Sequence, residues 1–425
     1  MRKIKLILSI IIILLLAGGL VLAYKQGWFD KITKRTTTRD NTTTEDHHHT
    51  GEDGIIENMV YNDLQFHFME LGNEYTGDST YIKAGDLDIL IDAGSRKNSA
   101  KTITNYINQY CTDGKLEYVI ATHSHQDHIA GFVGSTSVSA KPEDKGLFRQ
   151  FSVGTLIDFS QTDATSQLYS DYLNEVAYAV SQGTVHKQAA DYFADGQSNV
   201  IQLTENITMT IVWNRYYFEK SSDENNYSVC TLFSTGNNHF LLTGDLEKEG
   251  EEAIAEYYDG STPALTLPHC KLFKAGHHGS PSSSNDCLLS KITPEICTVC
   301  CCAGSSEYTN NVDNMFPSQE FVNRIAKYTD RVYVTTVLEY DSEEDDWINK
   351  SLNGNIIVSC DGTNVAIKCS NNLTKLKDSN WFNEEIWYKL DGTNRLVANK
   401  KNSTDFYNEN TSGAIKGPRR SWPSN

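Results

Sequence analysis

The sequence lacks the glycine-rich signatures of nucleotide-binding folds. Its 425 residues contain no G-x-G-x-x-G stretch and no P-loop, and no short-period repeat is evident. Both glycine motifs hold phosphates on backbone N–H groups. Neither a Rossmann chain nor a P-loop nucleotide site is therefore indicated.

Positive charge is also scarce. The chain has 37 Lys and Arg against 55 Asp and Glu, which gives a formal net charge of -18. A field of this sign repels the phosphate backbone of nucleic acids, so any contact with them must be local. With 39% hydrophobic residues, the chain can bury one large core or two modest ones, which fits a single α/β domain with appendages.

Only one segment is apolar enough to cross a membrane. It runs from Ile4 to Ala23, close to the ~20 residues that span a bilayer as a helix. Arg2, Lys3 and Lys5 lie at its start, and by the positive-inside tendency they keep the N-terminus cytoplasmic. Residues 1–24 are thus predicted to form a cytoplasmic stub and a single transmembrane anchor in the cell membrane, with the rest extracellular. The alternative is a cleaved signal peptide, whose apolar region is usually about 7–15 residues long.

Residues 25–57 are predicted to be a polar linker. The stretch from Lys31 to Gly54 is rich in Thr, Asp, Glu and His and has no apolar periodicity. The adjacent His47, His48 and His49 could capture a metal ion, but no scaffold fixes their geometry, and a solvated polar stretch is favoured.

Cysteines are plentiful for an exported chain, which raises the question of disulfides. Four of the ten lie in one short apolar segment: Cys297, Cys300, Cys301 and Cys302. The segment from Ile296 to Ala303 is typical of a buried strand, in which Cys acts as a small apolar residue. If one disulfide exists, Cys360 and Cys369 are the expected pair.

Hydrophobic patterning divides the remainder into helices and strands. Helical spacing is found at 99–110, 169–180 and 321–328. Strand patterns are found at 64–71, 81–83, 87–91, 118–122, 207–213, 229–233, 240–243, 331–337, 355–359 and 364–368. This order predicts two layers of sheet covered by helices. The domain is expected to span residues 58–370, followed by a tail, 371–425, with Trp and basic residues.

The strongest chemical signal follows the strand at 118–122. Four side chains that bind metals lie there within six residues: His123, His125, Asp127 and His128. Alternation at the strand end sends the first two to one side, and the following turn brings the last two to an adjacent point. The pattern predicts a metal site.

Two later segments repeat this arrangement of a short strand and a ligand. The apolar residues from Phe240 end in Gly244 and the carboxylate of Asp245, and Lys274 leads through Gly276 to His277 and His278. Taken singly, each segment could be an ordinary transition from strand to loop.

With these motifs in this order, the sequence resembles the metallo-β-lactamase superfamily, and within it the hydrolase domain of ComEC-type competence proteins. The matching stretches are Gly77–Ser79, Ile91–Gly94, His123–His128 with Gly131, Leu241–Asp245 and Lys274–Ser280. The resemblance covers residues 62–368 and implies a four-layer αββα sandwich with two divalent ions, zinc or manganese, between the sheet ends.

The resemblance divides the ligands between these two ions, with Asp245 bridging them. The first ion would be bound by two histidines, His123 and His125. The second would be bound by the end of the motif and one of two later histidines: Asp127, His128, and either His277 or His278. Asp92 would orient a ligand histidine from behind.

Metal-activated water implies hydrolysis, and no serine or cysteine nucleophile is required. Asp127 would also hold or deprotonate that water. Lys274 would take up charge on phosphate oxygens, or it is a solvated residue at a strand end.

Two departures from the family pattern bear on this hypothesis. Asn225–Ser228 stands where many members have a third histidine for the first ion, so that site is incomplete, filled by water, or suited to manganese. His186 is the outside candidate for the missing ligand. Phe316-Pro317 stands where ComEC-like chains often have His-Pro, which weakens the inference about substrate.

The resemblance favours a phosphoester or phosphodiester substrate, with DNA suggested by the ComEC-like branch. A single anchor cannot form the channel of full competence proteins, so DNA import is not expected. One alternative is a small extracellular substrate, such as a phosphocholine ester, a lactone or a β-lactam. The other is a surface module that binds nucleic acid or cell wall. In that case Trp381, Trp387 and the Arg419–Trp422 end would stack on bases or sugars, although packing against the core is favoured for this tail.

Overall fold

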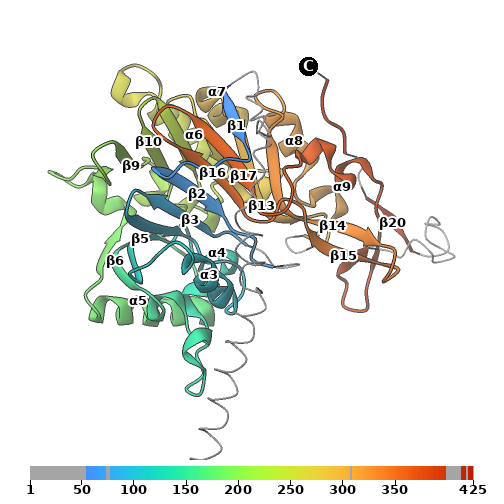
Figure 1. Ribbon diagram of the computed structural model, residues 1–425, viewed down its shortest axis with the longest axis horizontal. Coiled ribbons are helices and arrows are strands. Elements are labelled where there is room, and N and C mark those ends of the chain that lie inside the picture. Colours follow the sequence, from blue (N-terminus) through green and yellow to red (C-terminus); the bar gives the residue numbers. More distant parts are fainter. Residues whose placement is uncertain (1–53, 73–76, 307–308, 399–412, 418–419, 425) are drawn as a thin grey trace, which may run out of the picture. The chain divides into compact units, whose positions relative to one another are not determined.

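Two β-sheets lie face to face, and helices cover the outer face of each (Figure 1). The computed structural model describes residues 54–72, 77–306, 309–398, 413–417 and 420–424. Within them, the αββα sandwich expected from the sequence is confirmed.

The first sheet contains the N-terminal strands and closes with a hairpin from late in the chain. Its strand order is β1 (Ile55–Glu57), β17 (Val365–Cys369), β16 (Ile356–Cys360), β2 (Leu64–Phe68), β3 (Thr80–Ala84), β4 (Leu87–Ile91), β5 (Lys115–Ile120), β6 (Ser152–Asp158) and β7 (Val185–Gln188). Its outer face packs on α3 (Ser99–Ile107), α4 (Gln126–Val133) and α5 (Gln167–Ser181).

The second sheet is built from the middle of the chain. Its order is β15 (Asp346–Ser351), β14 (Val332–Asp341), β13 (Ile296–Ala303), β12 (Leu272–Lys274), β11 (Asn238–Leu242), β10 (Thr231–Thr235), β9 (Ile207–Ile211) and β8 (Val200–Gln202). Its outer face packs on α6 (Lys248–Tyr257), α7 (Asp286–Ile292) and α8 (Gln319–Ile325).

Aromatic residues join the two sheets across the centre of the sandwich. Phe66 of β2 stacks on Phe240 of β11 with ring centroids 4.8 Å apart, and it meets Phe233 of β10 edge-on at 5.3 Å. Because side chains alternate along a strand, the next residue on β11, Leu241, faces the helices instead. Both faces of β11 are therefore buried, which explains why its sequence is apolar at successive positions.

Parallel pairing of strands in each sheet brings the histidine and aspartate motifs of the sequence to a common edge. β4 and β5 are parallel in the first sheet, and β11 and β12 are parallel in the second. The carboxyl ends of parallel strands lie at the same edge, where α/β folds bind ligands. The loops that follow these four strands contain the histidine and aspartate motifs.

Several sequence predictions fall outside the described residues. These include the transmembrane anchor, His47–His49 and Arg419. Over the described ranges, no helix is both long and apolar enough to cross a bilayer. Strand β1 pairs in parallel with β17, so the last three residues of the predicted linker belong to the sheet.

The cysteine-rich segment is a buried strand, as predicted. All eight residues of β13 are buried, and the segment carries the four clustered cysteines. All ten cysteines are free, so Cys360 and Cys369, the pair favoured if one disulfide existed, are not joined. In the β16–β17 hairpin, Cys360 pairs with Val365 and Cys369 with Ile356, so the two thiols lie at opposite ends.

The tail after residue 371 packs against the second core. It forms a three-stranded sheet, β19 (Leu396–Ala398), β18 (Trp387–Leu390) and β20 (Ile415–Lys416), next to the short helix α9 (Asn380–Asn383). Trp381 is only 1% exposed and Arg420 only 8%. These two side chains are therefore unavailable to stack on a base or a sugar.

Arg420 fastens the C-terminal segment to a loop near the sheet edge. Its guanidinium lies 4.0 Å from the centroid of the Trp381 ring. Its Nε donates to the carbonyl oxygen of Pro317 at 3.4 Å, and its Nη2 donates to that of Met315 at 3.5 Å. The residue between them, Phe316, packs against the histidines described below.

Replacing Arg420 with Ala should lower the free energy of unfolding by about 2–4 kcal/mol, because a cation–π contact and buried charged hydrogen bonds are lost. Chemical denaturation of the full chain measures this. The matched control is Lys389→Ala, an exposed position on β18, which should change stability by less than about 0.5 kcal/mol. Equal effects of the two variants would contradict the assigned role.

Candidate metal centre

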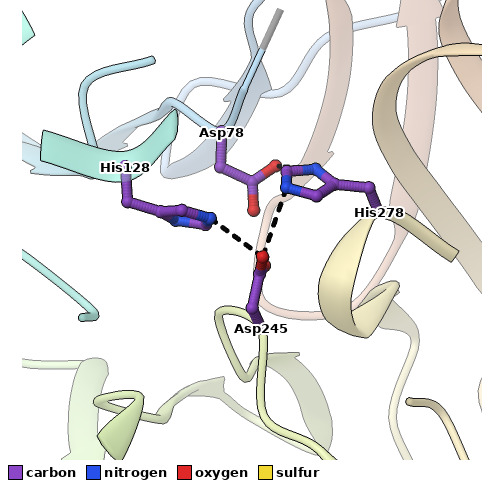
Figure 2. A group of neighbouring side chains, drawn as sticks. All are labelled: Asp78, His128, Asp245 and His278. Carbon is purple, nitrogen blue, oxygen red and sulfur yellow. Dashed lines mark ion pairs between the residues drawn. The ribbon is translucent and has the colours of Figure 1, made fainter. Parts of the chain in front are cut away.

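Buried polar side chains meet where the two sheet edges come together. Asp78, His128, Asp245 and His278 are each less than 5% exposed, and each offers a ligand atom within 4.8 Å of the others. Figure 2 shows them converging from the segment before β3 (Asp78), from α4 (His128) and from the loops after β11 and β12 (Asp245, His278).

His128 lies in the first turn of α4 and is held by Asp92. Its Nδ1 is 2.7 Å from Asp92 Oδ2. Asp92 in turn accepts hydrogen bonds from the backbone N–H and the hydroxyl of Thr122, both at 2.8 Å. Asp92 has a left-handed backbone, φ 59°, which costs free energy in a non-glycine residue and is common at functional sites. These contacts place Asp92 against the Nδ1 side of His128.

Nε2 of His128 points to the other side, toward Asp245. It lies 3.0 Å from Asp245 Oδ2, and it is a buried atom without a conventional hydrogen-bond partner. Burial would lower the pKa of His128, but the carboxylates of Asp245 and Asp92 outweigh burial and hold that pKa well above 6.5. A metal ion that bound Nε2 would displace the proton there, because a histidine ligand is neutral.

His278, and not His277, joins this group. Its Nδ1 lies 2.8 Å from the carbonyl oxygen of Cys300, and its Nε2 lies 3.2 Å from both Asp245 Oδ2 and Asp127 Oδ2. His277 points elsewhere, with Nδ1 at 2.5 Å from Glu247 and Nε2 at 4.0 Å from Asp245. The sequence alone could not separate these neighbours.

The loop that contains the two histidines has a strained backbone, and hydrogen bonds from two helices hold the residues that follow it. Within the turn Gly276–Gly279, His277 and His278 have φ of 42° and 52°, in the left-handed region. Glu251 of α6 accepts the backbone N–H groups of Ser284 and Asn285 at 2.6 and 2.7 Å. Arg324 of α8 donates to four carbonyl oxygens, those of Ser280, Pro281, Ser283 and Ser284.

Four ligand atoms have spacings that fit one ion. The four are Asp127 Oδ2, His128 Nε2, Asp245 Oδ2 and His278 Nε2, and the four histidine-to-aspartate separations among them are 3.0, 3.2, 3.2 and 4.0 Å. Bonds of about 2.0–2.2 Å in a tetrahedron place ligand atoms about 3.3 Å apart. The residues present therefore fit a divalent ion at this point.

Asp78 is the buried group that sequence reasoning left out of the site. It precedes β3, whose first residue Thr80 pairs with Ile91 at the end of β4, so antiparallel pairing brings it to the ligand edge. The residue in the sequence that could have indicated the position of Asp78 is its neighbour, Gly77. A Cβ at position 77 would lie 2.4 Å from the carbonyl oxygen of Asp127, so only glycine allows the backbone next to Asp78 to come this close to the histidine motif.

Lys274 does not face solvent, and the expectation that it contacts substrate phosphate does not fit its position. Its side chain is 3% exposed and forms an ion pair with Asp78. Its Nζ also lies 3.5 Å from Asp245 Oδ1 and donates to the carbonyl oxygen of Gly244 at 3.2 Å. Burial would lower the pKa of Lys274, but the two carboxylates raise it, so the ammonium stays charged and positions both of them.

His123 and His125 form a separate pair. His123 Nε2 lies 3.0 Å from His125 Nδ1, and the other nitrogen of His123 is 3.1 Å from Thr122 Oγ1 and 3.5 Å from Ser228 Oγ. His123 is buried, whereas His125 is exposed. The structure brings Asp127, His128, Asp245 and His278 together and leaves these two histidines beside them.

Comparison with known proteins agrees with this geometry. Residues 72–143, which contain Asp78, Asp92 and the whole His123–His128 motif, match the model of the metallo-beta-lactamase superfamily. This segment of the chain is thus similar to metallo-beta-lactamase domains. The predicted resemblance to competence proteins is confirmed as well.

Two curated relatives show the extent of that likeness. Recombination protein 2 of Haemophilus influenzae is 31% identical over 114 residues, 27% of this chain and 12% of that protein. Competence protein ComA of Neisseria gonorrhoeae is 30% identical over 106 residues, 25% of this chain and 14% of that protein. The match thus spans only a small part of the relatives' length. Among solved structures, the metallo-beta-lactamase fold protein YhfI from Bacillus subtilis is 10% identical, with 66% of this chain and 90% of that chain covered and a TM-score of 0.31.

Replacing Lys274 with Met should lower the free energy of unfolding of the metal-free chain by about 3–5 kcal/mol, because two buried carboxylates lose their cation. The matched control is Lys248→Met on α6, whose side chain is 61% exposed and which should change stability little. Urea denaturation in the presence of a chelator measures both. A small effect of K274M would mean that the ion pair is not what holds the carboxylates.

His186, the outside candidate for a ligand, belongs to a different contact. Its Nε2 lies 2.9 Å from Asp158 Oδ1, and this carboxylate raises the pKa of His186 above 6.5, against the effect of burial. A pKa raised by folding adds stability that is complete below the unfolded pKa and is lost as pH rises through the folded pKa.

The difference in melting temperature between the wild type and His186→Gln should therefore be larger at pH 5.5 than at pH 9. Thermal unfolding across this range tests the sign. A difference that is constant with pH would show that His186 contributes by packing alone.

Proposed function

We propose that this chain is a metal-dependent hydrolase of the metallo-beta-lactamase superfamily that cleaves a phosphoester, most readily a phosphodiester. The observation that supports it is the convergence of Asp78, His128, Asp245 and His278, with Asp127 Oδ2 3.2 Å from His278 Nε2 and with the buried Nε2 of His128 lacking a conventional hydrogen-bond partner. A divalent ion, zinc or manganese, would lower the pKa of a water and stabilise the charge that develops on attack.

The exposure of the four side chains indicates the side from which a substrate would approach. Asp127 is 20% exposed, whereas His128, Asp245 and His278 are at most 1% exposed. Asp127 therefore faces the open side and would accept a hydrogen bond from the attacking water. His125 and His277 are also accessible there, while Lys274 stays behind Asp245.

The substrate class is inferred from the relatives. They are named as a recombination protein and a competence protein, and these names favour an ester of nucleic acid. The net charge of -18 favours local engagement of one phosphodiester rather than a long track.

The location of the protein is inferred from its N-terminus, which lies outside the described residues. We propose a single-pass membrane anchor within residues 1–24, a linker that leads to the first sheet, and an extracellular catalytic domain. The tail after residue 370 would then stabilise this domain, since its sheet packs on the second core.

The test is turnover of a chromogenic phosphodiester and of single- and double-stranded DNA by the full chain in detergent, with added zinc or manganese. Asp127→Asn should lower kcat/KM by about 100-fold or more. Loss of a residue that hydrogen-bonds to a metal ligand already lowers activity by about 10–100-fold, and loss of the ligand itself should cost at least as much. The matched control, Asp195→Asn, changes an exposed aspartate and should keep full activity.

Two results would contradict the proposal. A metal-loaded chain that is inert on these substrates but opens a lactone or a β-lactam would exclude the phosphoester class. Equal activity in D127N and wild type would exclude the site.

A further inference from the structure

We propose that this chain binds one divalent ion tightly, at Asp127, His128, Asp245 and His278, and that the His123–His125 pair binds none. The inference rests on the proposed metal-dependent function. It departs from the two-ion arrangement that the family resemblance implies.

The first argument is that the single site is already arranged for an ion. Nε2 of His128 and Nε2 of His278 both face Asp245 Oδ2, at 3.0 and 3.2 Å. The opposite nitrogen of each ring is held, by Asp92 for His128 and by the carbonyl of Cys300 for His278. Anchoring of this kind fixes the ring orientation before a metal arrives.

The second argument is charge. Two carboxylates, Asp127 and Asp245, face the single site and would balance the charge of one divalent ion. Asp245 Oδ1, the oxygen left over for a bridge, already lies 3.5 Å from the ammonium of Lys274. A second divalent ion would therefore add buried positive charge next to an existing cation.

The other carboxylates around the site are already engaged. Asp78 is paired with Lys274, Asp92 binds Thr122 and His128, and Glu247 binds His277. Glu224, which contacts the loop of the His123–His125 pair, accepts the hydroxyls of Ser124 and Thr162. Asp78 Oδ1 is buried without a hydrogen-bond partner, but it lies 3.4 Å from His278 Nδ1, on the side of the single site.

The third argument is the ligand count on the His123–His125 side. Catalytic zinc sites use three protein ligands, and this side supplies two imidazoles. Ser228, from the segment where a third histidine would stand, instead accepts the backbone N–H of Asp245 through its Oγ at 3.1 Å.

Asn225, from the same segment, is also turned to another contact. Its Nδ2 lies 3.4 Å from Glu247 Oε1 and 3.4 Å from His277 Nδ1. Asn225 Oδ1 is nevertheless buried without a hydrogen-bond partner, and Ser228 Oγ lies 3.5 Å from His123 Nδ1. The segment therefore contains neutral oxygens only and no third imidazole or carboxylate for the pair, and such oxygens are weak ligands for zinc.

The test is the metal content of the full chain in detergent after equilibrium dialysis against excess zinc or manganese. One ion per chain is expected in the wild type and in His125→Ala, whose exposed position should tolerate the change. His269→Ala, another exposed histidine, is the matched control. Asp127→Asn and His278→Ala should each lose the bound ion, and thermal unfolding of the metal-free forms checks that they fold.

A spectroscopic measurement gives an independent answer. With manganese bound, the electron paramagnetic resonance spectrum should be the six-line signal of an isolated ion. Two ions per chain, an exchange-coupled manganese signal, or loss of the ion in H125A would each overturn the inference while leaving the proposed function intact. Absence of any bound ion in the wild type would overturn both.

Discussion

The contact of Asp245 with His128 and His278 is the interaction on which the rest of the site depends. One carboxylate oxygen lies 3.0 and 3.2 Å from two imidazole nitrogens, and all three side chains are at most 1% exposed. His128 lies in α4, which follows β5 of the first sheet, and the other two lie in the loops after β11 and β12 of the second, so the contact joins the two halves of the sandwich. A buried charge without a partner would lower the stability of the fold by several kcal/mol, so each charged side chain in the site must have an opposite charge or a hydrogen-bond partner close by.

That requirement accounts for the groups placed behind the ligands. Lys274 pairs with Asp78 and approaches Asp245, so it offsets negative charge without reaching the open side. Asp92 supports the histidine of the first sheet. Burial and neighbouring charge oppose each other at Asp245: burial raises the pKa of its carboxyl, but His128, His278 and Lys274 lower this pKa by more, and the carboxylate stays ionised.

The backbone around the site departs from ordinary geometry, and tertiary contacts hold it there. His277 and His278 are left-handed, and the loop after them is held by Glu251 and Arg324 on two different helices. The tail contributes from the other side, because Arg420 binds the carbonyls that flank Phe316, whose ring lies against both histidines. Residues far along the chain therefore influence how the ligand loop is held.

Sequence alone determined the layers and the position of the candidate ligands in the motifs. The strand patterns at 118–122 and 240–243 are followed within a few residues by histidine or aspartate, and such a pattern is a local feature that spacing reveals. The burial of all eight residues of β13 could likewise be predicted from their apolar composition.

Tertiary structure decided what depends on contacts between distant segments. The choice of His278 over its neighbour, the burial of Lys274 and the entry of Asp78 into the site all arise where the two sheet edges meet. The physical reason is that local sequence sets where a strand ends and which way its side chains alternate, whereas burial, charge partners and the free face of an imidazole are set by whatever packs against it.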